Sequence, residues 1–143
     1  GWRTDSMAAD ALYSGDWTGS GVNHAYLFYG NRFGAGRGKT AVSARVHLFA
    51  LNGGGGGATP NPMRVHNSAS KPASEPVTSS PFAGPALADN ANGWAPIPVA
   101  TAQDFLDGVQ QGLVVYGTGT SDYTALAPLS AQPMQGAVEI TWA

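Results

Sequence analysis

The clearest pattern in the chain is an alternation of two kinds of side chain over residues 42–51. Because successive side chains of a β-strand point to opposite faces, this alternation predicts a half-buried strand. The face expected in the core carries Val42, Ala44, Val46, Leu48 and Ala50. The outer face is expected to carry Ser43, Arg45, His47, Phe49 and Leu51.

A second alternating segment, residues 63–67, lies beyond a run of five glycines at 53–57. Glycine has no side chain to pack and loses much conformational entropy on folding, so this run is expected to form a flexible hairpin loop. We therefore predict that the second segment returns beside residues 42–51 as its paired strand. Met63 and Val65 are expected to point into the core.

Further short apolar segments, separated by turn-forming residues, are expected to complete an antiparallel sheet. They lie at 24–29, 94–99, 113–116, 123–129 and 137–142. The segment 94–99 contains two prolines, which donate no hydrogen bond to a neighbouring strand, so an edge position is expected. In the last segment Glu139 and Thr141 are expected to face outward.

One short helix is expected at residues 102–111. Thr101 can cap its start, with Asp104 three residues later in a spacing similar to a capping box. Gly112 suits its end, because glycine adopts the left-handed conformation that often closes a helix.

Two stretches of the chain are rich in turn-forming residues. Residues 68–85 contain many Ser, Pro and Ala, and we expect them to form an ordered crossover anchored by Val77 and Phe82. Residues 1–21 are expected to be an arm or edge strands that pack through their aromatic side chains.

Composition agrees with a β-rich fold. Charged residues make up only 11% of the 143 residues, whereas glycine and proline are frequent and 14 residues are aromatic. Turn-rich, charge-poor chains of this length are typical of β-sandwiches. We therefore predict one all-β domain over residues 1–143, an antiparallel jelly-roll-like β-sandwich with one short helix.

Charge and cysteine content exclude several classes of protein. The net charge is −2, so the chain lacks the basic excess of a nucleic-acid binder. It contains no cysteine, and therefore neither a disulfide framework nor a thiolate metal site. No apolar run approaches the length of a membrane span. The first residues lack a Met, and we expect a domain or fragment cut from a longer protein.

No catalytic motif is present in the sequence. The serines lack the Gly-x-Ser-x-Gly elbow of a hydrolase, and the glycine run lacks the Lys-Ser/Thr of a phosphate-binding loop. The three histidines, His24, His47 and His66, have no Asp or Glu beside them, so a metal site is not expected. We predict no enzymatic activity, no catalytic residues and no cofactor.

The outer face of the two paired strands is the first candidate site. If residues 63–67 lie beside 42–51, that face gathers Arg45, His47, Phe49, Arg64 and His66. Such a surface could contact an anionic or sugar ligand, or a second copy of the chain. The alternative is an ordinary solvated sheet face.

Aromatic residues near turns form a second set of candidates. Trp17, Trp94 and Tyr123 lie in or beside turns, where an exposed ring could stack on a sugar. The alternative for each is a packed side chain.

A family resemblance runs along nearly the whole chain. The segments that carry it are Trp2–Ser6, Gly15–Gly21, Phe28–Gly30, Gly38–Thr40 before Ser43–Val46, Met63–His66, Trp94, Gly112–Gly117 and Ala137–Trp142. In order and spacing they resemble the C-terminal β-sandwich domain of minor tail proteins from phages that infect actinobacteria.

The resemblance implies a non-enzymatic, extracellular domain in the tail fibre or tip of a virion. It would bind a host cell-envelope glycan or assemble the tail tip with other virion tail proteins. A homo-oligomer such as a trimer is expected, with neither nucleic acid nor a membrane span. The alternative is a carbohydrate-binding or hydrolytic module of a secreted enzyme.

Overall fold

The computed structural model of the chain describes residues 2–4, 12–16, 19, 21–53, 59–128 and 131–143. Over these residues it contains ten strands, one α-helix and one 3-10 turn. The strands are β1 (Trp2–Thr4), β2 (Leu12–Asp16), β3 (Val22–Phe28), β4 (Ala41–Gly53), β5 (Pro62–His66), β6 (Ser79–Ala83), β7 (Asn92–Pro96), β8 (Gly112–Val115), β9 (Thr124–Leu126) and β10 (Val138–Trp142). The helix α1 is Val99–Asp107, and the 3-10 turn η1 is Gly34–Gly36.

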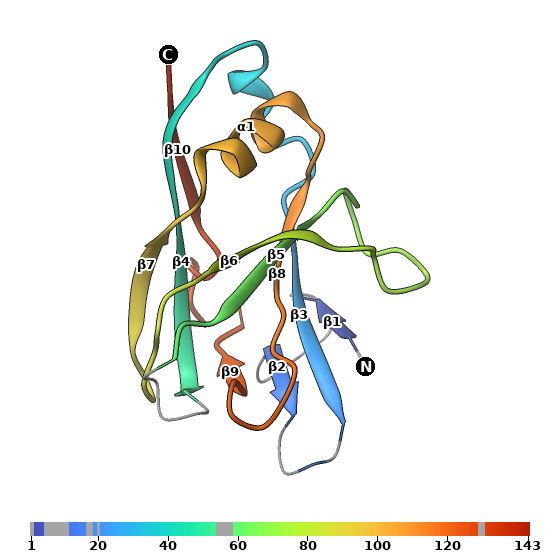
Figure 1. Cartoon of the computed structure of the whole chain (residues 1–143), viewed down its shortest axis with the longest axis vertical. Helices are drawn as coiled ribbons and strands as arrows, with labels where there is room; N and C mark the ends of the chain where they lie inside the picture. The colour runs from blue at the N-terminus through green and yellow to red at the C-terminus, as the bar shows by residue number, and fades with distance from the viewer. Residues whose placement is uncertain (1, 5–11, 17–18, 20, 54–58, 129–130) are drawn as a thin grey trace.

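All ten strands belong to one sheet that curls over itself. Its order is β10-β4-β9-β2-β3-β8-β5-β6, with β7 paired to β4 and β1 paired to β3. In Figure 1, β10, β4 and β7 lie on one side, β3, β8 and β5 on the other, and β9 and β2 join them below. All the pairings are antiparallel except that of β1 with β3. The prediction of an all-β fold with one short helix is thus confirmed.

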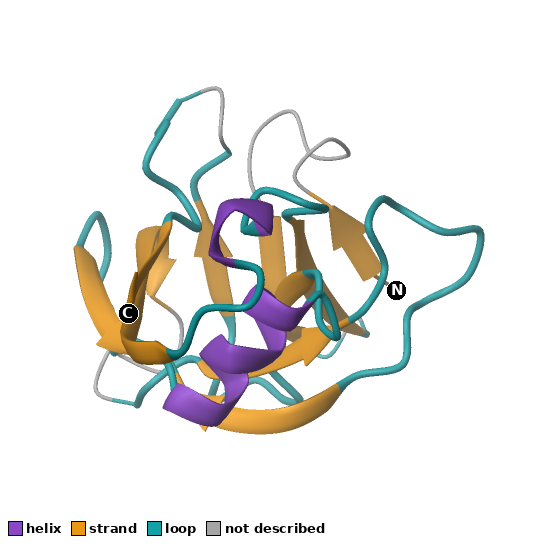
Figure 2. Ribbon diagram, turned by 90° about the horizontal axis from the view of Figure 1, so that it is seen from above, coloured by secondary structure: helices purple, strands orange, loops and turns teal. Residues whose placement is uncertain are grey.

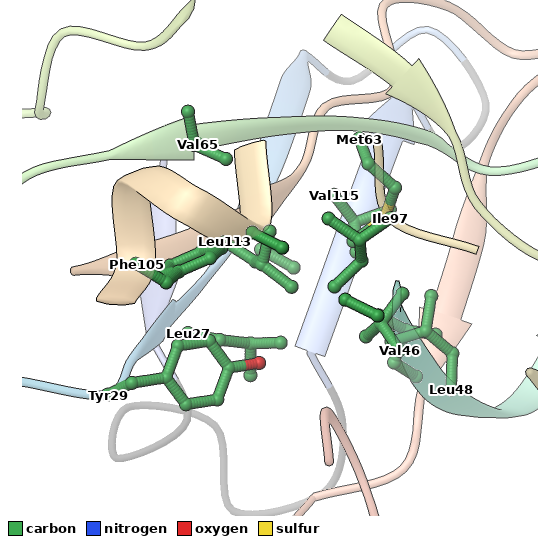
Figure 3. Close-up of a cluster of buried hydrophobic side chains, with 14 of the residues drawn as sticks. Leu27, Tyr29, Val46, Leu48, Met63, Val65, Ile97, Phe105, Leu113 and Val115 are labelled. Carbon is green, nitrogen blue, oxygen red and sulfur yellow. The ribbon is translucent and has the colours of Figure 1, made fainter. Parts of the chain in front are cut away.

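The core fills the space between the two sides of the curled sheet. Figure 3 shows Leu27 and Tyr29 facing Val46 and Leu48 across this space. The helix α1 lies across the open end, as the view from above shows (Figure 2), and contributes Phe105 and its neighbour Leu106 to the core. Burial of these apolar side chains is the main stabilising term of the fold.

Strand β4 follows the predicted alternation with two exceptions. Ala44, Val46, Leu48 and Ala50 are buried, as predicted. Val42, predicted in the core, is 56% exposed, because the register with β10 shifts at this point: Ser43 pairs with Thr141 but Ala41 pairs with Trp142, so Val42 is the extra residue of a bulge and Ala41 is buried instead. His47, the second exception, is described with the candidate site.

The return strand pairs differently from the prediction. Met63 and Val65 of β5 are buried as predicted, but β5 pairs with β8 and β6, not with β4. The partners of β4 are instead β10, β7 and β9. Alternation determines which face of a strand is buried, but it carries no information about the partner, and this is why the pairing was wrong. Of the glycine run, Gly53 ends β4, and 54–57 lie outside the described residues.

The sheet formed by β3, β8 and β5 is covered on both faces. Every residue of β8 is buried, Val114 on the outer face as completely as Leu113 and Val115 on the inner one. The crossover that follows β5 covers the outer face, where Tyr26 donates a hydrogen bond to Glu75. Burial and this contact with Glu75 raise the pKa of Tyr26, so it remains a protonated donor.

The crossover and the N-terminal strands differ in part from expectation. Phe82 packs against the core as predicted, but Val77 is 90% exposed and anchors nothing in the described structure. β2 pairs with both β3 and β9, so it lies inside the sheet and is not an edge strand. β7 pairs with β4 alone, which confirms its edge position.

The helix begins and ends earlier than predicted. It starts after Pro98, which makes no side-chain cap, and Thr101 is buried within it. Gly108, not Gly112, ends it in the left-handed conformation, with its N–H bonded to the carbonyls of Asp104 and Phe105. No helix in the described part of the chain is long and apolar enough to cross a membrane.

Candidate functional site

A shallow groove crosses the outer face of β7, β4 and β10. Its volume is about 310 Å³, and its lining is Ser43, Ala44, Arg45, Trp94, Ala95, Pro96, Glu139 and Thr141. The strand register builds it, because Arg45 stands between Pro96 on β7 and Glu139 on β10. In the next row Ser43 lies opposite Thr141.

Arg45 is the central side chain of the groove. Its Nε and Nη2 donate to the two carboxylate oxygens of Glu139 at 3.2 and 3.3 Å, the two-pronged geometry that a guanidinium favours. Its Cζ lies 4.0 Å from the centre of the Trp94 ring, which is a cation–π contact. Arg45 and Glu139 are nevertheless 47% and 58% exposed, so a ligand can reach both.

His47 lies beside Trp94, its partner across β4 and β7, and does not itself line the groove. It was predicted to be exposed on the outer face, but it is 8% exposed, because Trp94 and the segment around Met134 cover it. Its ring centre lies 5.2 Å from that of Trp94. Its Nε2 and Nδ1 each lie 3.1 Å from an oxygen, the side-chain Oδ1 of Asn92 and the carbonyl of Met134. These contacts fix the imidazole, and the imidazole in turn holds the indole.

The groove combines apolar walls with polar groups of both charges. Trp94 and Pro96 supply the apolar surface, while Ser43 and Thr141 supply hydroxyl groups. Because Glu139 offsets the charge of Arg45, the lining has no net charge. Such a surface is suited to a ligand that has both apolar and hydroxyl faces and is itself uncharged.

Arg64 and His66 lie elsewhere, so the predicted five-residue patch does not form. In the sheet order β9, β2, β3 and β8 separate β5 from β4. Arg64 stacks on the ring of Tyr116 at 4.4 Å. His66 is 1% exposed, which contradicts its predicted outward position.

His66 is instead a fully packed histidine. Its Nε2 lies 2.9 Å from the carbonyl oxygen of Leu27, and its Nδ1 accepts a hydrogen bond from the N–H of Ser68. Burial lowers the pKa of His66, because the charged form would lose its hydration. The imidazole is therefore neutral and structural.

Three other candidates are not part of the groove. Phe49 is half-buried, and its backbone N–H and carbonyl bond to the side chain of Gln135. Tyr123 is buried, with its ring 6.4 Å from that of Tyr13, so it is not free to stack on a sugar. Trp17 lies outside the described residues.

Sequence reasoning found two residues of the groove and missed their partners. Arg45 and Trp94 were candidates, but Glu139, Thr141 and Ser43 were not. The alternation in 137–142 did place Glu139 and Thr141 on an outer face, and both are exposed. The missing information was the pairing of β10 with β4, which places Glu139 beside Arg45 and Thr141 beside Ser43.

The third histidine, His24, forms a separate cluster with Glu75 and Tyr116. Its Nδ1 lies 2.5 Å from a carboxylate oxygen of Glu75, and its ring stacks on Tyr116 at 3.7 Å. Within the described residues, no three His, Asp or Glu side chains gather in a way that could hold a metal ion.

Comparison with known proteins adds no relative. Neither a family model, nor a curated protein, nor a solved structure matches this chain.

Proposed function

We propose that this chain is a non-enzymatic domain of a virion tail fibre or tip, and that it binds a host cell-envelope glycan in the groove at Trp94. Its place in an extracellular tail, together with other tail proteins or in a homo-oligomer, rests on the family resemblance alone. Under this proposal the curled sheet corresponds to the jelly-roll-like sandwich that the resemblance implies.

The ion pair between Arg45 and Glu139 beside Trp94 carries the glycan proposal. Neighbouring hydroxyls of a sugar can accept from a guanidinium and donate to a carboxylate at the same time. The apolar C–H face of a sugar ring is suited to contact with an indole and a proline. A neutral hexose is favoured over an acidic one, since an acidic group would meet Glu139 as well as Arg45.

The hydrolytic alternative has less support in this groove. Glycoside hydrolysis commonly needs two carboxyl groups on either side of the scissile bond. Of the described residues that line the groove, Glu139 is the only carboxylate, and both of its oxygens are engaged by Arg45.

The test is binding to a glycan array and to isolated actinobacterial cell wall, with Trp94→Ala beside Trp142→Ala. Trp142 is a matched control, because it lies at the end of β10, is partly exposed and does not line the groove. We expect Trp94→Ala to weaken binding roughly tenfold or more, the loss of a well-placed aromatic contact. Trp142→Ala should bind as the unsubstituted chain does.

Two outcomes would count against the proposal. Equal loss in both variants, or in neither, would mean that the groove is not the site. Release of reducing sugar from cell wall, abolished by Glu139→Gln, would favour the enzyme instead.

A further inference from the structure

A second hollow lies away from the groove, between the end of β3 and the segment that leads into β10. Its volume is about 390 Å³, and among its lining residues are Tyr29, Arg32, Phe33, Pro133, Gly136 and Val138. This volume falls within the range of small-molecule sites.

The walls of the hollow are fixed on both sides. Phe33 contacts Tyr29 and Phe105, with ring centres 5.7 and 5.4 Å apart, so the turn after β3 is tied to the core. Across the hollow, the Tyr29 hydroxyl donates to the carbonyl of Gly136. Gly136 has a φ of +70°, a conformation that favours glycine, and a Cβ atom there would come within 2.7 Å of a methyl group of Leu27. The hollow is therefore formed before any ligand arrives.

Among the described residues, the lining contains one cation and no anion. Arg32 is exposed, and no ion pair recorded among the described residues includes it. Three other arginines differ: Arg45 pairs with Glu139, Arg64 stacks on Tyr116, and Arg37 donates to the carbonyl of Leu106. The guanidinium of Arg32 can thus meet an anion without first breaking a contact.

The one side-chain amide of the lining is already occupied. Gln135 accepts from the N–H of Phe49 and donates to the carbonyls of Phe49 and Ala127. It has little left to offer the many hydroxyls of a sugar. The walls of the hollow combine apolar side chains, such as Phe33, Pro133 and Val138, with polar backbone groups, and Arg32 is the one charged side chain among the described lining residues. This lining favours an apolar body with one negative group.

We propose that this hollow binds an amphipathic monoanion, an acyl chain or aromatic ring that ends in a carboxylate. The apolar part fills the space between Phe33 and Val138, and the carboxylate meets the guanidinium of Arg32. This site is independent of the glycan groove, because the two share no lining residue.

The probes for the test are octanoate, octanol and octylamine, which share an apolar chain and differ in charge. Their binding is followed by amide chemical shifts, in the unsubstituted chain and in Arg32→Gln and Lys39→Gln. Lys39 is the matched control, because it is an exposed cation a few residues away that does not line the hollow.

We expect octanoate to shift the amides of residues 27–33 and 133–138, and to bind about three- to tenfold more tightly than octanol. Arg32→Gln should remove this preference for the acid, and Lys39→Gln should keep it. Octylamine should bind most weakly.

Three results would overturn the proposal: equal affinity for octanoate and octanol, an unchanged preference in Arg32→Gln, or no shifts at these residues. Octanoate binding should persist in Trp94→Ala, so failure here is distinguishable from failure of the glycan proposal.

Discussion

At the scale of single residues, His66 packs more closely on Gly112 than any neighbour does on another described glycine. The two residues are paired across β8 and β5. A Cβ atom at residue 112 would overlap the imidazole of His66 and the backbone carbonyl of Leu27. The absence of a side chain at residue 112 is what lets the imidazole lie flat on the sheet. The strand pattern predicted neither the glycine's role nor the burial of His66, because the first depends on the pairing of β5 with β8 and the second on contacts with Leu27 and Ser68.

Replacement of Gly112 by alanine is expected to be strongly destabilising. Part of the overlap is with backbone, which cannot move aside, so the free energy of unfolding should fall by about 2 kcal/mol or more. Gly119→Ala is the control, because no atom lies near its Cβ position and its φ is not positive. Urea denaturation of both variants measures the difference, and similar stabilities would contradict this account.

The neutral imidazole of His66 predicts a loss of stability in acid. Because burial lowers its pKa in the folded state, the unfolded chain binds a proton first as the pH falls below about 6.5. The contribution of the neutral imidazole to the free energy of unfolding is therefore complete above that pH. It is lost below that pH, by at most about 1.4 kcal/mol for each pH unit. Denaturation between pH 5 and 7 should show a shallower slope in His66→Gln, and NMR should show His66 titrating below its ordinary pKa. Titration at or above 6.5 would contradict the prediction.

At the scale of elements, β4 shows what alternation can and cannot predict. Its inward and outward positions were correct from Ser43 to Leu51, with the exception of His47. Its partners were not, because strand faces follow from local sequence whereas pairing follows from the whole chain. For the same reason only part of the candidate groove was predicted: Arg45 and Trp94 were found, and Glu139 was not. The predicted helix boundaries were also wrong, because the helix begins after Pro98 and ends at Gly108, and Thr101 lies inside it and does not cap it.

Leu48→Ala and Arg45→Ala should separate the two faces of β4. Leu48 is fully buried, and its truncation should cost roughly 2–5 kcal/mol through the cavity it leaves. Arg45 forms a half-exposed ion pair, and its removal should cost about 1 kcal/mol or less. Thermal or urea unfolding measures both, and a larger loss from Arg45→Ala would mean that the faces are inverted.

At the scale of the whole molecule, side chains pack on both faces of the curled sheet. One set forms the core inside it, and a second layer lies between its outer face and the crossover. The outer layer exists because the crossover lies over β3, β8 and β5, held by Glu75 to His24 and Tyr26. Sequence alone suggested an ordered crossover but not which surface it covers, since no pattern in residues 68–85 identifies His24 or Tyr26 as partners.

Glu75→Gln should loosen the crossover without opening the inner core. The amide cannot accept as strongly from His24 and Tyr26, and we expect a cost of about 1 kcal/mol. Hydrogen exchange should rise at Ser68, whose N–H bonds to His66, and should remain slow at Val46. Glu139→Gln, which breaks an ion pair on the other side of the sheet, is the control. Unchanged exchange at Ser68 in Glu75→Gln would mean that other contacts hold the crossover.

The three-way pairing of β4 has a consequence for synthesis. β4 is the longest strand, yet the first of its partners, β7, begins only at Asn92, and the others follow at Thr124 and Val138. On the ribosome this strand is therefore complete long before anything in the chain can pair with it. An unpaired apolar strand is a template for association with other chains, and late pairings of this kind fold slowly. We expect nascent chains to aggregate more when many ribosomes translate the message at once or elongate rapidly. Slower elongation or added chaperone should raise the yield of soluble protein.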